Sequence, residues 1–223
     1  MNSDSKIITL TYYLLRTLLK PFIKGLWVKN VTGLSNIPKS GSAIFALNHQ
    51  SFLDFLTFTV ISPRNVHFLA AEKFFESLFW KPIMILSGQI KVTRESHDKA
   101  VVHSIVKKHI DKGMLLAIFP EGTRSHSESE MLKAYTGIAK YALEHRIPII
   151  PVGVKGAHGI FSKGSSKLKF RKSVEINIGE PLIHPEYWGK HLDKSTCTLV
   201  TEKVIKKIEA LSGKKYNHYE FNH

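Results

Sequence analysis

Cysteine is almost absent from this 223-residue sequence, which contains only Cys197. A single cysteine excludes an internal disulfide and offers no paired-cysteine spacing for a metal site. It is also consistent with a reducing compartment. We interpret Cys197 as a structural residue of a C-terminal helix.

Acidic residues are scarce as well, with 18 Asp and Glu against 32 Lys and Arg, so that the formal net charge is +14. A surplus of this size attracts polyanions or anionic lipid. The lysines are dispersed along the chain, and the sequence contains no helix-turn-helix, zinc-finger or RNP pattern. We therefore expect no nucleic-acid partner, and we attribute the charge to an anionic membrane surface and to phosphorylated substrates.

Long uncharged hydrophobic runs are also missing. The most apolar N-terminal stretch, residues 7–28, is interrupted by Arg16, Lys20 and Lys24, which would be costly in the hydrocarbon core of a bilayer. No small-residue cleavage site follows it, so it is not a cleavable signal peptide. The three cations recur every four residues and leave a broad apolar face.

We therefore expect residues 1–29 to form an amphipathic segment that lies in the membrane interface. Pro21 should kink or split this helix. A helix that simply packs in the core is the alternative. A second apolar stretch, residues 74–86, is too short to span a bilayer. It is either a core helix or a second surface that contacts the membrane.

Apolar runs and helical patterns alternate between residues 30 and 212, which predicts a single α/β domain with a mixed sheet flanked by helices. We expect further helices at 52–61, 98–112, 131–145 and 194–211. The expected strands are a short strand and turn at 31–38, then 43–47, 66–70, 88–92, 114–119, 147–154 and a strand or strand pair at 167–178. The tail, residues 213–223, is predicted to be loose.

One histidine lies where a strand ends and a helix begins, which is where ligands usually bind in α/β sheets. His49 follows the apolar strand 43–47, and Asp54 comes one turn into the next helix. A neutral imidazole can take a proton from a hydroxyl, and a carboxylate on its other nitrogen fixes the tautomer. The alternative is a capping box, with Ser51 at the N-cap and Asp54 near the positive end of the helix.

Several other catalytic patterns are absent from the sequence. It contains no G-x-S-x-G nucleophile elbow and no H-E-x-x-H zinc pattern. Gly159 and Gly164 have P-loop spacing, but serines follow where a P-loop requires lysine. The histidines other than His49 show no ligand spacing, and we interpret them as surface or structural residues. We expect no metal and no cofactor.

Four blocks of the sequence, in order, resemble the glycerolipid acyltransferases of the 1-acylglycerol-3-phosphate acyltransferase family. The first, residues 48–54, resembles the family's H-x4-D block, and the third, residues 119–125 with the sequence FPEGTRS, matches closely. The second, residues 88–94, ends in Arg94, and the fourth is the proline-containing strand 149–152. Thr93 departs from the family's commonest second block, which leaves the acceptor head group open.

The resemblance implies an acyltransferase that works without a metal or a covalent enzyme intermediate. His49 would deprotonate the acceptor hydroxyl, and Asp54 would orient His49. The residues expected to hold the glycerol phosphate are Arg94, Glu121, Gly122, Thr123 and Arg124.

The expected donor is acyl-CoA or acyl-carrier protein, and the expected acceptor is a lysophosphatidic acid-like lipid at the cytoplasmic face of a membrane. The alternatives are an acyltransferase for another lysophospholipid or for glycerol 3-phosphate, and a non-catalytic basic protein of the same fold that binds lipid or nucleic acid.

Overall fold

The structure is a computed structural model that describes residues 3–78, 80–92, 99–161, 163–165 and 167–221. The strands in these ranges are β1 (Val28–Thr32), β2 (Ala43–Leu47), β3 (Val66–Ala71), β4 (Ile90–Val92), β5 (Leu115–Ile118), β6 (Ile149–Lys155) and β7 (Val174–Ile178). The α-helices are α1 (Ser3–Leu26), α2 (Leu53–Ile61), α3 (Lys73–Glu76), α4 (Trp80–Leu86), α5 (Lys99–Asp111), α6 (Gly137–His145) and α7 (Lys194–Ser212), with 3-10 turns at Leu34–Asn36 and Pro185–Tyr187.

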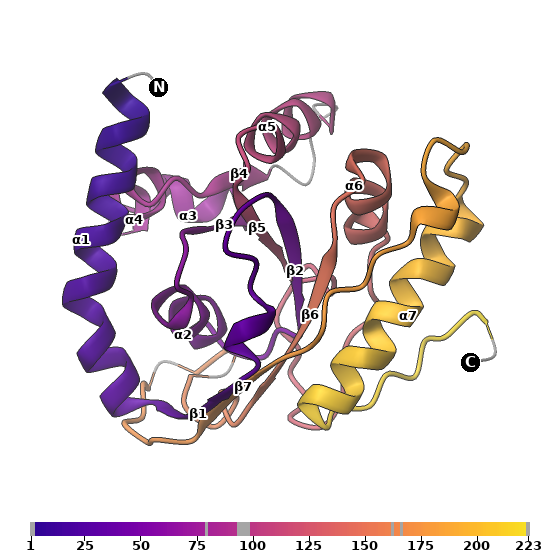
Figure 1. The fold of residues 1–223 in the computed structure, drawn as a ribbon. Helices are drawn as coiled ribbons and strands as arrows, with labels where there is room; N and C mark the ends of the chain where they lie inside the picture. The colour runs from indigo at the N-terminus through magenta and orange to yellow at the C-terminus, as the bar shows by residue number, and fades with distance from the viewer. Residues whose placement is uncertain (1–2, 79, 93–98, 162, 166, 222–223) are drawn as a thin grey trace.

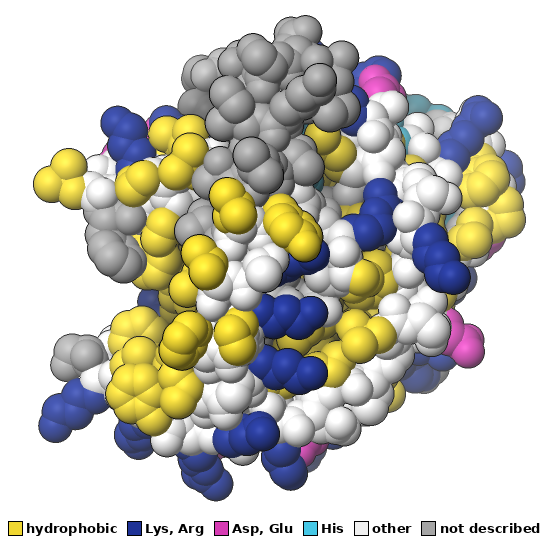
Figure 2. All heavy atoms as spheres, turned by 60° about the vertical axis from the view of Figure 1, so that its left-hand side comes forward, with side chains coloured by type: hydrophobic (Ala, Val, Ile, Leu, Met, Phe, Trp, Pro, Cys, Tyr) yellow, Lys and Arg dark blue, Asp and Glu magenta, His cyan; other side chains and the backbone are white. Residues whose placement is uncertain are grey.

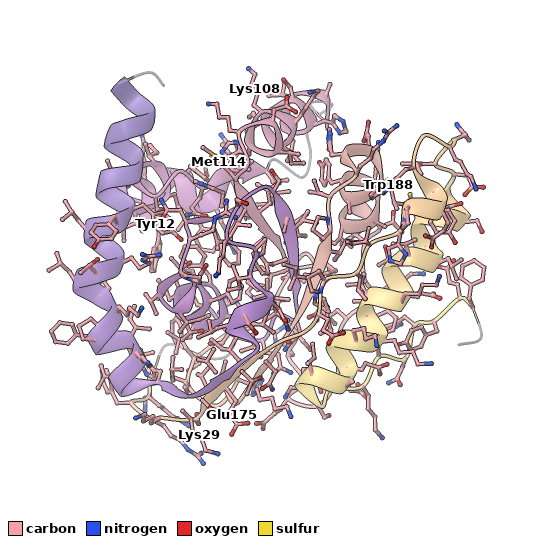
Figure 3. All side chains as sticks on the ribbon, in the orientation of Figure 1. Tyr12, Lys29, Lys108, Met114, Glu175 and Trp188 are labelled. Carbon is pink, nitrogen blue, oxygen red and sulfur yellow. The ribbon has the colours of Figure 1, made fainter. Side chains whose placement is uncertain are left out.

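The strands form one sheet in the order β1-β7-β6-β2-β5-β3-β4 (Figure 1). Neighbouring strands are parallel except β6 and β7, which are antiparallel. At the edge, Lys29 on β1 pairs with Glu175 on β7 at 2.7 Å (Figure 3). The predicted α/β domain with a mixed sheet is confirmed.

Strand β2 lies at the centre of the sheet and is buried along its whole length. Because side chains alternate along a strand, Phe45 and Leu47 contribute to the core on one face, and Ile44 contributes to the core on the other. Helices α1, α2 and α4 cover the first face, and α5, α6 and α7 cover the second (Figure 1). A strand buried on both faces reads as an unbroken apolar run, which explains why it was recognisable in the sequence.

Helix α1 is part of the core as well as of the surface. Tyr12 and Ile23 of α1 are buried, as is Trp27 directly after it. The Tyr12 hydroxyl (Tyr12 is labelled in Figure 3) accepts a hydrogen bond from the Val66 amide at 3.1 Å. Arg16, expected on the polar stripe, donates to the Ser62 carbonyl at 2.8 Å. The alternative considered for this helix, packing in the core, is therefore confirmed for one of its faces.

Three local predictions are wrong. Of the kink or split expected at Pro21, the split is wrong, because α1 is one helix over Ser3–Leu26. The predicted strand 167–178 is a strand only over Val174–Ile178, where β6 and β1 supply partners for its backbone. The helix predicted from residue 131 begins at Gly137, because residues 131–134 are engaged in hydrogen bonds to other parts of the chain.

The C-terminal tail is not loose where the structure describes it. Tyr216 is 6% exposed and belongs to the core on the second face of the sheet. Its amide donates to Glu209 at 2.6 Å, and its hydroxyl accepts from the Ala134 amide at 3.1 Å. The burial of the Tyr216 ring orders this segment. The basic and polar residues that surround Tyr216 in the sequence do not indicate this burial.

None of the helices in the described parts of the chain has the length and hydrophobicity needed to cross a bilayer.

Candidate active site

The first and third sequence blocks meet at the carboxyl ends of two neighbouring inner strands. Strands β2 and β5 are adjacent and parallel, with Ala46 opposite Ile118, so their carboxyl ends lie together. His49 follows β2, and Phe119 follows β5. Their rings stack with centroids 3.8 Å apart and an angle of 14° between the planes. The apolar ring of Phe119 therefore fixes one face of the imidazole.

Asp54 contacts the imidazole of His49 and also accepts hydrogen bonds from nearby backbone amides. Its Oδ2 lies 3.0 Å from His49 Nδ1 and also accepts from the amides of Gln50 at 2.7 Å and Ser51 at 2.8 Å. The carboxylate is completely buried. A carboxylate only accepts hydrogen bonds, so this arrangement favours the tautomer with hydrogen on Nδ1 and a free lone pair on Nε2. Of the predicted capping box, the hydrogen bond from the Ser51 amide to Asp54 is present, but the N-cap of α2 is Phe52 instead of Ser51.

Glu121, in the segment after β5, connects the loop that carries His49 to the chain near Leu132. Its Oε1 accepts from the His49 amide at 2.6 Å, and its Oε2 accepts from the Leu132 amide at 2.8 Å. The Ser125 amide also donates to the His49 carbonyl at 2.8 Å. Burial raises the pKa of Glu121 to about 7, although both amide hydrogen bonds favour its charged form. Glu121 is not among the residues that line the cavity next to His49.

This cavity is mainly apolar and opens beside His49. Its apolar walls come from α2, β3, α3, α4 and the end of β5, and the residues are Phe52, Phe55, Phe68, Leu69, Ala70, Ala71, Phe74, Met84, Ile118 and Phe119. Its other lining residues are His49, Lys73, Gly122, Thr123, Arg124 and Lys163. An apolar cavity with a few polar groups is typical of a small-molecule binding site.

The structure brings most of the predicted site residues together. The cavity lining includes His49, Gly122, Thr123 and Arg124. Asp54 does not line the cavity but contacts the His49 ring. Arg94 and Thr93 lie outside the described residues. The sequence reasoning missed Lys73 and Lys163 as cavity residues. No local sequence pattern marks either lysine, and only the folded chain places both at the cavity beside His49.

Gly122 occupies a backbone conformation that favours glycine. Its φ of 65° lies in the left-handed region, and a Cβ at this position would be 2.9 Å from the ring of Tyr135. The turn that follows β5 therefore depends on glycine both for its backbone and for space. This geometry lets the chain turn sharply between Glu121, which faces the interior, and Thr123 and Arg124, which face the cavity.

The C-terminal tail holds the segment after Arg124 against the loop that carries His49. Gln50 Nε2 donates to the carbonyls of Ser127 at 2.9 Å and Glu128 at 2.8 Å. From the opposite side, Lys214 Nζ also donates to the Glu128 carbonyl, and the Lys215 amide donates to Ser129 at 2.8 Å. Residues 125–131 are thus clamped between the His49 loop and the tail, an arrangement that no local sequence pattern indicated.

A histidine paired with a buried carboxylate thus lies at a mainly apolar cavity whose lining includes cationic side chains. Residues 29–155 match the family model described as Acyltransferase, which is more than half of the chain, and the chain belongs to that family. The protein is an acyltransferase, and the family predicted from the four blocks is confirmed.

Relatives and a solved structure agree with this assignment. The chain is 25% identical to the 1-acyl-sn-glycerol-3-phosphate acyltransferase of Bacillus subtilis over 181 residues, which cover 80% of this chain and 85% of that protein. It is 29% identical to the enzyme of the same name from Helicobacter pylori over 157 residues, covering 66% and 65%. The fold is similar to that of the LPA acyltransferase PlsC from Thermotoga maritima, with a TM-score of 0.74, 23% identity and coverage of 95% and 83%.

Proposed function

We propose that this enzyme transfers a fatty acyl chain from acyl-CoA or acyl-carrier protein to the free hydroxyl of 1-acylglycerol 3-phosphate, which yields phosphatidic acid. The observation that carries the proposal is the His49–Asp54 pair beside an apolar cavity whose polar lining is cationic. The names of the relatives that cover most of the chain support the same substrate class.

In the proposed reaction, His49 Nε2 takes the proton of the acceptor hydroxyl. The oxygen attacks the thioester carbonyl, a carbon–oxygen bond forms, and the carbon–sulfur bond breaks. The imidazolium returns its proton to the leaving thiolate. Asp54, at 3.0 Å from Nδ1, stabilises the imidazolium, and Phe119 keeps the ring in place. A thioester is already activated, so this sequence of steps requires no nucleophilic side chain.

The acceptor phosphate has a cationic set of side chains available. Arg124 lines the cavity with Gly122 and Thr123, and Lys73 and Lys163 line it as well. A guanidinium binds a phosphate with two hydrogen bonds, whereas lysine acts as a point charge. We assign Arg124 to the phosphate, with Arg94 as a further candidate from the second block. Glu121, engaged by two backbone amides, acts by positioning the His49 loop instead of contacting the acceptor.

Replacing Arg124 with alanine is expected to weaken acceptor binding much more than donor binding. Loss of a charge-assisted phosphate contact costs about 1.5–3 kcal/mol, which corresponds to roughly a 10- to 150-fold rise in the acceptor KM. The measurement is acyl transfer at varied acceptor and at varied acyl-CoA. Arg171→Ala, at an exposed position outside the cavity, is the matched control.

A panel of acceptors with the native enzyme tests the proposed function itself. Lysophosphatidic acid should be used in preference to the corresponding monoacylglycerol, which lacks only the phosphate. Equal use of the two lipids, or an unchanged acceptor KM in Arg124→Ala, would contradict the role of the phosphate. Preference for glycerol 3-phosphate or for another lysophospholipid would identify the acceptor as one of the alternatives.

We also propose that the enzyme works as a peripheral or monotopic protein on the cytoplasmic face of a membrane, with α1 as its docking element. Leu14, Leu18 and Phe22 recur every four residues and are 50%, 67% and 67% exposed. Lys20 and Lys24 are exposed on the same helix. Hydrophobic and basic side chains lie side by side on the face of the molecule that Figure 2 shows. An apolar stripe beside cations is typical of helices that bind anionic bilayers.

Replacing both Leu18 and Phe22 with serine is expected to weaken vesicle binding. Each side chain contributes about 2 kcal/mol when it is transferred into an apolar phase, so partitioning should fall roughly a hundredfold or more. Deleting α1 would instead uncover the core around Tyr12 and Ile23, so point changes are the sharper test. Binding is measured by sedimentation with neutral and anionic vesicles at low and high salt.

The double variant Val101→Ser and Ile183→Ser provides the control, because these side chains are 52% and 55% exposed and lie outside α1. Equal loss in both double variants would show only a general effect of exposed apolar area. Unchanged binding of the α1 variant would move the docking role to residues 74–86.

A further inference from the structure

Two histidines and a glutamate from different helices converge on the face of the sheet covered by α5 and α6. His103 lies on α5, while Glu144 and His145 lie at the end of α6. One potential ligand atom from each residue lies within 4.8 Å of the other two. His103 Nε2 is 3.1 Å from a Glu144 oxygen, and the two imidazole centroids are 5.6 Å apart. None of the three lines the cavity beside His49.

One of these ring nitrogens lacks a hydrogen-bond partner. His145 Nε2 is buried and makes no hydrogen bond within the described structure. A buried polar atom of this kind is unfavourable unless a hydrogen, a water or an ion satisfies it. By contrast, the side chains of His103 and Glu144 are 27% and 39% exposed, so an ion can reach the cluster from solvent.

We propose that His103, Glu144 and His145 form a binding site for a divalent transition-metal ion, with Zn²⁺ the best match. Two imidazoles and one carboxylate are a common Zn²⁺ ligand set, whereas Mg²⁺ and Ca²⁺ prefer oxygen ligands throughout. Tetrahedral bonds of about 2.0–2.2 Å place ligand atoms about 3.4 Å apart. The observed separations therefore require only small side-chain rotations.

The surrounding charges permit a cation here. Lys107, on the same helix as His103, is paired with Asp111 at 2.7 Å, which offsets its charge. The ring of Tyr141 packs against His103 with centroids 5.5 Å apart and limits its rotation. An ion bound at this cluster fastens α5 to α6, two helices on the same face of the sheet. It leaves a fourth position for water and plays no part in the reaction at His49.

The test uses the full chain, treated with EDTA and dialysed, then titrated with ZnCl₂. Calorimetry should give one strong site per chain. Saturation at about a hundred times the dissociation constant should raise Tm by about 5–10 °C. His103→Ala, Glu144→Gln and His145→Ala should each weaken binding at least tenfold, since each removes one of three ligands. Co²⁺ should give the visible absorption of a four-coordinate ion with the native chain and not with these three variants.

The exposed His191→Ala is the matched control, and it should bind Zn²⁺ as the native chain does. MgCl₂ should produce no shift. Absence of strong Zn²⁺ binding to the native chain would overturn the proposal. Unchanged binding in His103→Ala and Glu144→Gln would overturn it as well, because the ion would then occupy other histidines. Glu144 is partly exposed, so its variant remains informative if His145→Ala does not fold.

Discussion

Replacing His49 with alanine is expected to reduce acyl transfer by about 10²–10⁴-fold or more, because general-base catalysis contributes that much. Among the described residues that line the cavity, His49 is the only histidine, and none of them is a carboxylate that could replace it as a base. The other polar lining residues are Lys73, Thr123, Arg124 and Lys163, which serve poorly as neutral bases at neutral pH.

The fold of His49→Ala should survive. Its side chain is 17% exposed, and the backbone hydrogen bonds of residue 49 to Glu121 and Ser125 do not depend on the ring. Turnover is measured with saturating acyl-CoA and lysophosphatidic acid, and folding by thermal unfolding. His191→Ala, an exposed histidine outside the cavity, provides the comparison. A folded His49→Ala protein with near-native turnover would refute the mechanism.

Asp54→Asn should be nearly as damaging, with a loss of turnover of about 10²–10⁴-fold. The asparagine oxygen can still accept from the amides of Gln50 and Ser51. In the position of Asp54 Oδ2, which now lies 3.0 Å from His49 Nδ1, the same oxygen can also accept from the imidazole. The neutral amide no longer stabilises the imidazolium that forms when Nε2 takes a proton, so proton transfer to His49 becomes less favourable.

The stability of Asp54→Asn separates catalysis from capping. Both backbone hydrogen bonds can be retained, and a completely buried charge is removed, so we expect Tm to change by no more than about 4 °C. Asp111→Asn, which alters an exposed pair with Lys107, controls for loss of one negative charge. A large fall in Tm with turnover preserved would assign Asp54 to capping alone.

Much of the fold could be predicted because its strands are short, buried and apolar. The residues of β2 and β5 are hydrophobic without interruption, because both faces of these strands are covered. Such a run is typical of a buried strand. The errors fall where tertiary partners decide the outcome. Residues 167–173 have an extended pattern, but within the described part of the chain no strand pairs with them. Residues 131–134 have a helical pattern, but several of their amides donate to other parts of the chain.

The sequence by itself determined the family, through its four blocks. It also determined the pairing of His49 with Asp54, because both residues lie within one strand-to-helix connection, where sequence spacing sets the distance. Only the tertiary structure decided how Glu121 is used, which lysines line the cavity and what the tail contacts. Glu121 bonds to the backbone at His49, Lys73 and Lys163 come from separate segments, and Tyr216 reaches Ala134. These contacts join residues far apart in the chain, and the order of strands in the sheet, which no local pattern encodes, brings them together.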